Sequence, residues 1–177
     1  DGFKNIDPQF LRAKSDPKGE YCLPYAFGTV GIVYNRKVLG KDITGWKDLI
    51  ATAKAKGVKF TLLDDMREVM AVGLMLNGHK VNSTDPQELQ QAADTVIAMK
   101  PDVAAFTYDS RPMVASGDVA AAHFFVGAMV DVFGNPKDLG YVIPEEGATM
   151  YQEDMCVLKT APNKASALKF LQFYTKP

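Results

Sequence analysis

The fold of this chain is decided by Phe60-Thr61-Leu62-Leu63-Asp64-Asp65-Met66-Arg67-Glu68-Val69-Met70. The segment opens with an apolar run of the length of a short buried strand. It then changes to helical spacing, with apolar or small residues at Met66, Val69, Met70, Gly73 and Leu74. A strand that passes directly into a helix is half of a β-α-β unit, and ligands of open α/β sheets bind at the carboxyl ends of the strands. Asp65 and Glu68 stand at this point, on one face of the first helical turn. The helix dipole also favours acids there whatever their role, so their position alone does not assign a function.

Length and composition exclude several classes of function. The chain has 177 residues, enough for one sizeable domain or two small ones, and its 47% hydrophobic and 23% charged residues are typical of a globular protein. A formal net charge of -1 gives no electrostatic footprint for nucleic acid or an acidic membrane surface. The longest apolar run, residues 119–130, is too short to span a bilayer. The first residues have neither the basic start nor the apolar core of a signal peptide, and a helical pattern runs almost to Pro177. We therefore expect both ends to be cut from a longer protein.

Two cysteines, Cys22 and Cys156, each lie in a strand-like run. They are too few for a disulfide scaffold and have no partners at metal-ligand spacing. One interpretation is two buried free thiols, which pack as small hydrophobic side chains. The other is a disulfide, which requires the two strands to be neighbours and the compartment to be oxidising.

Strand-like and helical segments alternate along the chain. Residues 1–19 are polar and predict a loop, with at most one helical turn near Pro8-Gln9-Phe10-Leu11. Thr44 is the predicted N-cap of the next helix, which Gly57 closes. The strongest helix start is Asp85 followed by Pro86. The predicted strands are 21–27, 29–34, 59–63, 103–107, 119–125, 140–144 and 150–158, the last interrupted at 152–154. The other predicted helices are 66–76, 86–100, 111–116, 127–133 and 162–174, the last with Ala167, Phe170, Leu171 and Tyr174 facing inward. This alternation predicts an α/β domain with a mostly parallel sheet flanked by helices.

The sequence lacks the motifs of common catalytic and cofactor sites. It contains no G-x-S-x-G nucleophile turn, and Gly28 with Gly31 lacks both the lysine of a P-loop and the third glycine of a dinucleotide fingerprint. Of the two histidines, His79 follows a helix-ending glycine and should be solvated. His123 lies in an apolar strand and should be a hydrogen-bonded core residue. With so few imidazoles there is little material for metal sites or acid-base catalysis, and we predict no metal, no cofactor and no catalytic residue.

Carboxylates close to aromatic residues remain as candidates for a binding site. Asp65 and Glu68 follow one predicted strand, Phe125 ends another, and Tyr151 with Glu153 lies in a third. If the middle of the sheet is parallel, the first two of these sites share one edge. Carboxylates accept charge-assisted hydrogen bonds from ammonium groups, and aromatic faces add a cation–π attraction of about 0.5–2 kcal/mol each. The pattern favours an organic cation as ligand, although each aromatic residue taken alone also fits a core position.

Several segments of the chain resemble, in the same order, the periplasmic spermidine/putrescine-binding proteins. These are the receptors of ABC transporters and have the two-lobed type II periplasmic-binding-protein fold. The resemblance covers about residues 20–175, and the D-D-x-R-E-V and V-I-P-x-E-G-A pieces together are specific. The matching segments are Leu23-Pro24-Tyr25-Ala26-Phe27-Gly28 through Tyr34-Asn35, Thr44-Gly45-Trp46-Lys47-Asp48-Leu49, Leu62-Leu63-Asp64-Asp65-Met66-Arg67-Glu68-Val69, Asn82-Ser83-Thr84-Asp85-Pro86 and Tyr141-Val142-Ile143-Pro144-Glu145-Glu146-Gly147-Ala148.

The resemblance implies a polyamine site. Asp65 and Glu68 would contact the amines, and Phe125 would stack on the methylenes. Tyr151 would supply a second stacking face and Glu153 a further carboxylate. The family usually has Trp at the two aromatic positions and Asp at the last one. These conservative departures bear on which polyamine is preferred rather than on the ligand class.

The resemblance also implies how the chain is divided. Residues 1–35 would be a first-lobe segment and crossover strand, 36–150 the second lobe, and 151–177 the return crossover strand and a first-lobe helix. Cys22 and Cys156 fall on neighbouring strands of that fold, which makes a disulfide between them an option. The implied partners are a polyamine and the membrane permease of an ABC importer, in the periplasm or another extracytoplasmic compartment, with no nucleic acid. Because part of the family's site and sheet is absent from this chain, an oligomer or an exchanged strand is also expected.

Three alternatives stay open. Asp154 competes with Glu153 for the carboxylate role, although alternation along a strand turns it to the opposite side. A receptor of the same fold could bind another organic cation, an anion, or an amino acid with Arg67 or Arg111 clamping its carboxylate. A hydrolase with a carboxylate pair needs groups on opposite sides of the scissile bond, whereas the acid pair of this chain lies on one helical turn.

Overall fold

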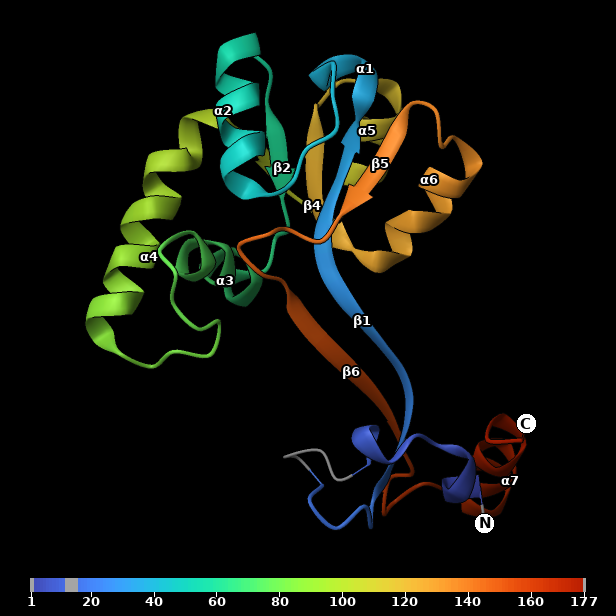
Figure 1. Ribbon diagram of the computed structural model, residues 1–177. Helices are drawn as coiled ribbons and strands as arrows, with labels where there is room; N and C mark the ends of the chain where they lie inside the picture. The colour runs from blue at the N-terminus through green and yellow to red at the C-terminus, as the bar shows by residue number, and fades with distance from the viewer. Residues whose placement is uncertain (1, 12–15, 177) are drawn as a thin grey trace. The chain divides into compact units, whose positions relative to one another are not determined.

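The computed structural model describes residues 2–11 and 16–176, and the chain divides into two compact units. We call Thr29–Met150 the sheet unit, and Asp1–Gly28 together with Tyr151–Pro177 the terminal unit. Two long strands, β1 (Cys22–Asn35) and β6 (Thr149–Cys156), contribute residues to both units (Figure 1).

The observed elements follow the predicted order closely. The terminal unit also contains η1 (Gly2–Asn5), η2 (Pro8–Phe10) and α7 (Lys164–Tyr174). The other elements of the sheet unit are α1 (Arg36–Leu39), α2 (Trp46–Lys56), β2 (Phe60–Leu62), α3 (Met66–Leu76), α4 (Pro86–Met99), η3 (Lys100–Asp102), β3 (Val103–Phe106), α5 (Ser110–Ser116), β4 (Ala121–Phe125), η4 (Val126–Ala128), α6 (Met129–Gly134) and β5 (Leu139–Val142). The bounds of α3 are those predicted. In the described part of the chain, no helix has the length and apolar character needed to cross a membrane.

The sheet is mixed. Its strand order is β3-β2-β4-β1-β5, with β6 paired to β1 outside this path. β2 is parallel to β3 and β4, whereas β1 is antiparallel to β4 and β5. The predicted α/β class is confirmed, and the expectation of a mostly parallel sheet is corrected to a mixed one, because β1 runs opposite to both of these neighbours.

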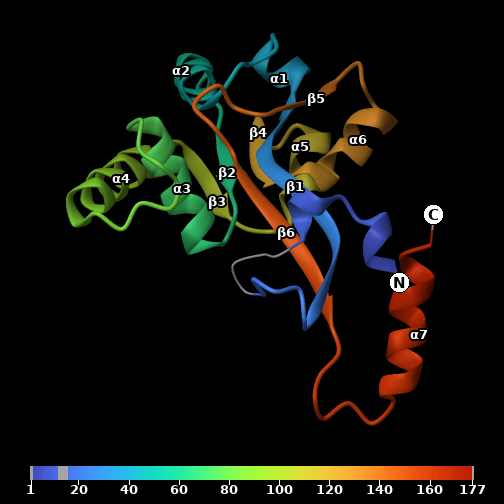
Figure 2. The ribbon, with the colours of Figure 1, turned by 60° about the horizontal axis from the view of Figure 1, so that its bottom comes forward.

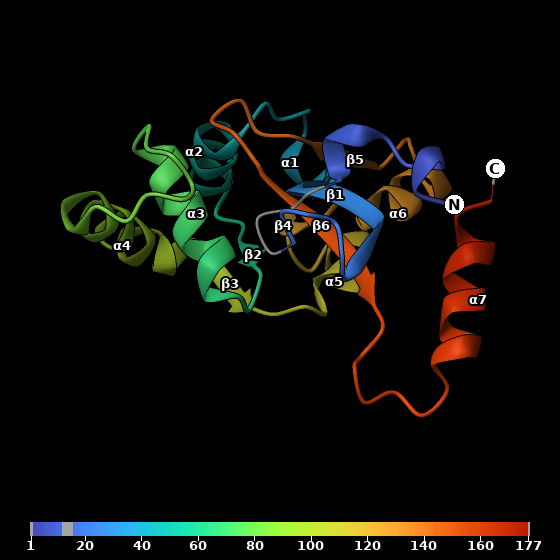
Figure 3. The same ribbon diagram turned by 90° about the horizontal axis from the view of Figure 1, so that it is seen from below.

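Helices cover both faces of the sheet. Side chains alternate along a strand, so Ile32 and Val33 of β1 point to opposite faces. Ile32 belongs to the larger core cluster, which includes residues of α2, α3 and α4, and Val33 to a smaller cluster with residues of α5 and η4. Figures 2 and 3 show α2, α3 and α4 on one side of the strands and α5 and α6 on the other.

Helices α3 and α4 approach each other closely at Gly73. A Cβ atom on Gly73 would lie 2.5 Å from the backbone oxygen of Ala92, so a glycine is needed at this crossing. The predicted start of α4 is confirmed, because Asp85 accepts hydrogen bonds from the backbone N–H groups of Gln87 and Glu88. The close approach at Gly73 packs α3, the helix that carries Glu68, against α4.

The start of α2 differs from the prediction. Gly45 rather than Thr44 is the N-cap, and the cap makes no side-chain hydrogen bond of its own. Instead, the Glu146 carboxylate accepts hydrogen bonds from the backbone N–H groups of Trp46 and Lys47, at 3.0 and 2.9 Å. A Cβ atom on Gly45 would collide with this carboxylate, so glycine makes room for a cap supplied from the β5–β6 connection.

Two strands are more regular than predicted, and one helix is more exposed. β1 is a single strand of 14 residues with no break at Gly28, and β6 runs without interruption through 152–154. Phe170 and Tyr174 of α7 do not face inward but are 56% and 48% exposed. No residue of α7 is buried within the described structure.

Cys22 and Cys156 form a disulfide that joins β1 to β6, with their Cα atoms 4.3 Å apart. The interpretation as buried free thiols is therefore wrong. Disulfides form and persist in oxidising compartments.

Candidate functional site

Asp65 stands at the end of β2 as the N-cap of α3. Its Oδ1 atom accepts hydrogen bonds from the backbone N–H groups of Arg67 and Glu68, at 2.8 and 3.1 Å. These bonds satisfy two of the donors that the start of a helix leaves open. The other oxygen, Oδ2, accepts a hydrogen bond from the hydroxyl of Tyr108 at 3.4 Å. One oxygen of Asp65 thus holds the helix, and the other faces the loop that follows β3.

Glu68 lies in the first turn of α3 and is held through a single oxygen atom. Its Oε2 atom accepts a hydrogen bond from the hydroxyl of Thr149 at 2.7 Å, and Nε2 of His123 lies 3.8 Å from the same atom. Oε1 accepts no hydrogen bond from the residues that the structure describes. Burial raises the pKa of Glu68, against the effect of the Thr149 hydrogen bond, which lowers it. Burial disfavours the charged form of Glu68, and a cation placed next to the carboxylate would stabilise that charged form.

His123 is the buried neighbour of this carboxylate. It is 2% exposed on β4, and its ring meets that of Trp46 edge-on, with centroids 5.2 Å apart. The predicted core position is confirmed, but the predicted hydrogen bond is not, since Nδ1 has no partner among the described residues. Burial lowers the pKa of His123 to about 3, so the ring is neutral at ordinary pH and does not form an ion pair with Glu68.

Phe125 ends β4, and its ring stacks on the ring of Tyr108, with centroids 6.3 Å apart and planes 11° from parallel. Tyr108 therefore connects Phe125 to Asp65. Sequence reasoning misses Tyr108, although a signal for it was present. It follows β3, the parallel neighbour of β2, so it belongs to the same carboxyl edge of the sheet as Asp65.

Tyr151 and Glu153 lie on β6 within the terminal unit. Glu153 accepts a hydrogen bond from the hydroxyl of Tyr25 on β1, and burial raises the pKa of Tyr151. Asp154 instead accepts a hydrogen bond from Gln152 at 2.8 Å, and alternation along β6 places these two on the face opposite to Glu153.

The structure thus connects three of the five predicted site residues within one unit. Asp65, Glu68 and Phe125 all belong to the sheet unit and are linked through α3 and Tyr108. The contribution of Tyr151 and Glu153 to the same site stays a prediction.

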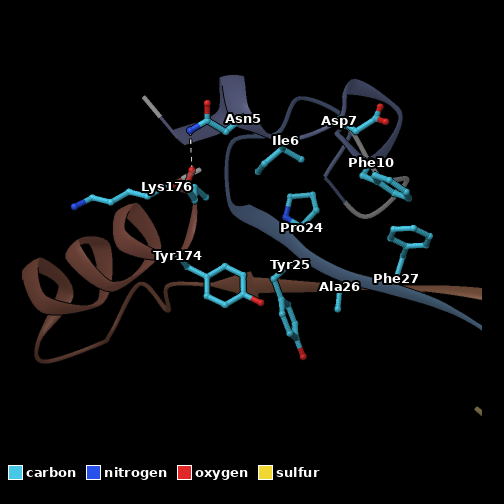
Figure 4. A pocket seen from close by; sticks show the side chains of 11 residues that line it. Asn5, Ile6, Asp7, Phe10, Pro24, Tyr25, Ala26, Phe27, Tyr174 and Lys176 are labelled. Atoms are coloured by element: carbon cyan, nitrogen blue, oxygen red, sulfur yellow. Dashed lines mark hydrogen bonds between the residues drawn. The ribbon is translucent and has the colours of Figure 1, made fainter. Parts of the chain in front are cut away.

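A pocket of about 370 Å³ lies wholly within the terminal unit (Figure 4). Aromatic residues line much of it. Phe10 stacks on Phe27 with ring centroids 4.3 Å apart, and Tyr25 meets Tyr174 edge-on at 6.0 Å. None of the five predicted site residues lines this pocket, although Tyr25 joins it to the carboxylate of Glu153.

A second cavity of about 370 Å³ lies beside Tyr108 in the sheet unit. Arg111 on its wall donates two hydrogen bonds to the Asp131 carboxylate, at 2.5 and 2.9 Å. A guanidinium engaged in such a bidentate pair is not free to clamp the carboxylate of an amino-acid ligand. Within residues 2–11 and 16–176, no three side chains of His, Cys, Asp or Glu are grouped as a metal site would need.

Carboxylates and rings at the carboxyl edge of an α/β sheet are the features of a protein that binds a small ligand at that edge. The chain belongs to the bacterial extracellular solute-binding protein family, whose model matches residues 1–177.

Several curated proteins are similar to this chain over nearly all of its length. The spermidine/putrescine-binding periplasmic proteins of Escherichia coli strain K12 and Salmonella typhimurium are 33% and 32% identical to this chain over 99% of its residues. The chain spans about half the length of these curated relatives, 50% in both.

Two solved structures that are about 30% identical in sequence also match the fold of this chain. The spermidine/putrescine ABC transporter substrate-binding protein PotD from Streptococcus pneumoniae, in complex with calcium and HEPES, matches with a TM-score of 0.85 and 32% identity, over 100% of this chain and 55% of that one. The Tp0655 (TpPotD) lipoprotein of Treponema pallidum matches with a TM-score of 0.81 and 31% identity, over 99% of this chain and 57% of that one.

Proposed function

We propose that this chain is part of a receptor that binds polyamines such as putrescine and spermidine outside the cytoplasm and delivers them to an ABC importer. The observation that carries the proposal is the arrangement of Asp65 and Glu68. Each carboxylate is fixed to the protein through one oxygen: Oδ1 of Asp65 caps α3, and Oε2 of Glu68 accepts from Thr149. Oε1 of Glu68 accepts no hydrogen bond from the described residues, and Oδ2 of Asp65 accepts one long hydrogen bond, from Tyr108, so both oxygens can accept from a ligand. The names of the relatives support the same ligand class.

An alkyl diamine matches this arrangement in two respects. Its ammonium groups form charge-assisted hydrogen bonds with carboxylates, which are about twice as strong as neutral ones. Its methylenes leave water when they pack against aromatic faces, here those of Phe125 and Tyr108. An ammonium next to Glu68 also offsets the cost of burying that charge.

Two further residues, on β6, belong to the proposed site. Tyr151 supplies a second stacking face, and Glu153 supplies the carboxylate for a further ammonium. Residues 36–150 form the second lobe, and residues 1–35 and 151–177 form the crossovers and part of the first lobe. Hinge closure of the two lobes would cover the ligand, and a membrane permease would receive it; no reaction is catalysed.

Isothermal titration calorimetry of putrescine and spermidine into the intact protein tests the proposal. Glu68→Gln should weaken binding by about 2–5 kcal/mol, the cost of removing one partner of a desolvated charge pair. Asp65→Asn should weaken binding while the helix cap persists, because asparagine caps helices as well as aspartate does. The matched control is Glu145→Gln on an exposed loop, which should bind as the wild type does.

Two results would contradict the proposal. Undiminished affinity in Glu68→Gln would remove this carboxylate from the site. Tighter binding of arginine than of spermidine to the wild-type protein would assign an amino-acid ligand instead.

A further inference from the structure

Tyr108 is fixed in position next to the proposed site. It lies two residues beyond β3, and the preceding residue, Thr107, donates a backbone hydrogen bond to Leu62 of β2 at 2.9 Å. The hydroxyl of Thr107 also accepts a hydrogen bond from the backbone N–H of Asp109 at 3.0 Å. The turn that carries Tyr108 is therefore tied to the end of β2, three residues before Asp65.

The Tyr108 side chain makes two contacts of different chemistry. Its hydroxyl donates to Oδ2 of Asp65 at 3.4 Å, and its ring stacks almost parallel to that of Phe125. The side chain is nevertheless 48% exposed, so part of it is open to solvent. An aromatic ring that is partly exposed and has its polar tip on a carboxylate is suited to a ligand that has both an alkyl part and a cationic head.

We propose that Tyr108 is a further ligand-contacting residue that selects primary ammonium groups. This inference rests on the proposed polyamine function. Its hydroxyl accepts one N–H of the ammonium while it continues to donate to Asp65, and its ring extends the aromatic surface of Phe125 along the methylenes.

The selectivity follows from counting donors and acceptors. A primary ammonium has three N–H donors, and a carboxylate oxygen or a phenolic oxygen accepts each of them. Asp65 offers Oδ2 and Glu68 offers Oε1, because their other oxygens are occupied by the backbone and by Thr149. The oxygen of Tyr108 supplies the third acceptor. A protonated tertiary amine has a single N–H and gains nothing from this third acceptor.

Calorimetric titration of two ligands into the intact protein tests the inference. The ligands are putrescine, with two primary ammonium groups, and N,N,N′,N′-tetramethylputrescine, in which each nitrogen keeps one N–H. Tyr108→Phe retains the ring and removes the hydroxyl. It should weaken putrescine binding about threefold to tenfold, the worth of one hydrogen bond, and leave the binding of the tetramethyl analogue unchanged. Tyr108→Leu, which also removes the ring, should weaken both ligands.

The matched control is Tyr21→Phe, which alters a tyrosine of the terminal unit that is 75% exposed, and it should bind both ligands as the wild type does. If Tyr108→Phe binds putrescine as tightly as the wild type does, the hydroxyl makes no contact with the ligand and the inference fails. An equal loss for both ligands also overturns it, because the hydroxyl would then act only by holding Asp65. If the wild-type protein does not bind putrescine, the proposed function fails together with this inference. Failure of the inference alone leaves the wild-type affinity intact.

Discussion

The hydroxyl of Thr149 donates a hydrogen bond to Oε2 of Glu68 at 2.7 Å, across 81 positions of the sequence. Thr149 is the first residue of β6, so this bond ties the start of that strand to the first turn of α3. It orients the carboxylate with Oε1 left for a ligand, and it opposes the rise in the pKa of Glu68 that burial causes.

Thr149→Val should therefore weaken putrescine binding. The substitution replaces the hydroxyl by a methyl group of the same size, and the loss should be about threefold to tenfold, as expected for one hydrogen bond. Calorimetry measures it. Thr52→Val is the control, because the hydroxyl of Thr52 donates to Asp48 on α2, outside the proposed site. Wild-type affinity in Thr149→Val would show that Glu68 needs no orienting donor.

Binding should also weaken as the pH falls through the raised pKa of Glu68. The amines remain protonated throughout this range, so only the carboxylate changes charge. Because its pKa lies above the ordinary value of a glutamate, the loss should begin at a higher pH than for a solvated carboxylate. The ligand binds the charged form, so binding should release protons in the upper part of this range. Titrations in buffers of different ionisation enthalpy measure that release. Binding heats that are independent of the buffer there would contradict the prediction.

His123 should make the fold sensitive to acid. The histidine pKa is 6.5 in the reference state and about 3 in the folded protein. Below pH 6.5 the unfolded chain therefore takes up a proton that the folded protein does not, and stability that is present above this pH is lost as the pH falls. For a pKa shift of this direction the loss is about 2 kcal/mol at about pH 5.

The variant His123→Leu should lose less stability than the wild type between about pH 7 and about pH 5, by about that amount. Urea unfolding at the two pH values measures the difference. Glu68, whose raised pKa acts in the opposite sense, is present in both proteins. Identical pH dependence of the two proteins would mean that His123 becomes protonated without unfolding.

Gly73→Ala should destabilise the sheet unit although alanine is the better helix former. Its Cβ atom would lie 2.5 Å from the backbone oxygen of Ala92, so α4 would have to move away from α3. Overpacking of this kind costs about 1–3 kcal/mol, and it is opposed by a gain of about 1 kcal/mol in helix propensity. Urea unfolding followed by circular dichroism should show a net loss. Gly134→Ala, whose Cβ atom would meet nothing within 4 Å, should be neutral or stabilising.

Glu146→Ala should destabilise α2 from a distance of 100 residues in sequence. It removes the carboxylate that caps the backbone N–H groups of Trp46 and Lys47, at a cost of about 0.5–2 kcal/mol in the free energy of unfolding. Glu145→Ala is the matched control, since the hydrogen bond from Glu145 to Thr44 uses only the backbone and survives the substitution. Equal stability of the two variants would contradict the role of Glu146.

Local patterns in the sequence were sufficient for elements whose determinants lie close together. The apolar spacing of α3 and the Asp85 cap of α4 each occupy a few consecutive residues, so both helices could be predicted. The start of α2 could not, because its cap comes from Glu146, far along the chain. The exposure of Phe170 was also beyond the sequence, since an apolar stripe on a helix does not reveal whether anything covers it.

By itself the sequence determined the α/β class and the chemistry of the candidate site, because a strand that leads into acidic residues and then a helix is a local signal. Asp65 and Glu68 were predicted from this signal and Phe125 from the end of another strand, and their role in binding stays a prediction. Only the tertiary structure decided the antiparallel pairing of β1, the disulfide between Cys22 and Cys156, and the contact of Tyr108 with Asp65. The physical reason is that these pairings join residues from 43 to 134 positions apart, where neither spacing nor composition records which segments fold against each other.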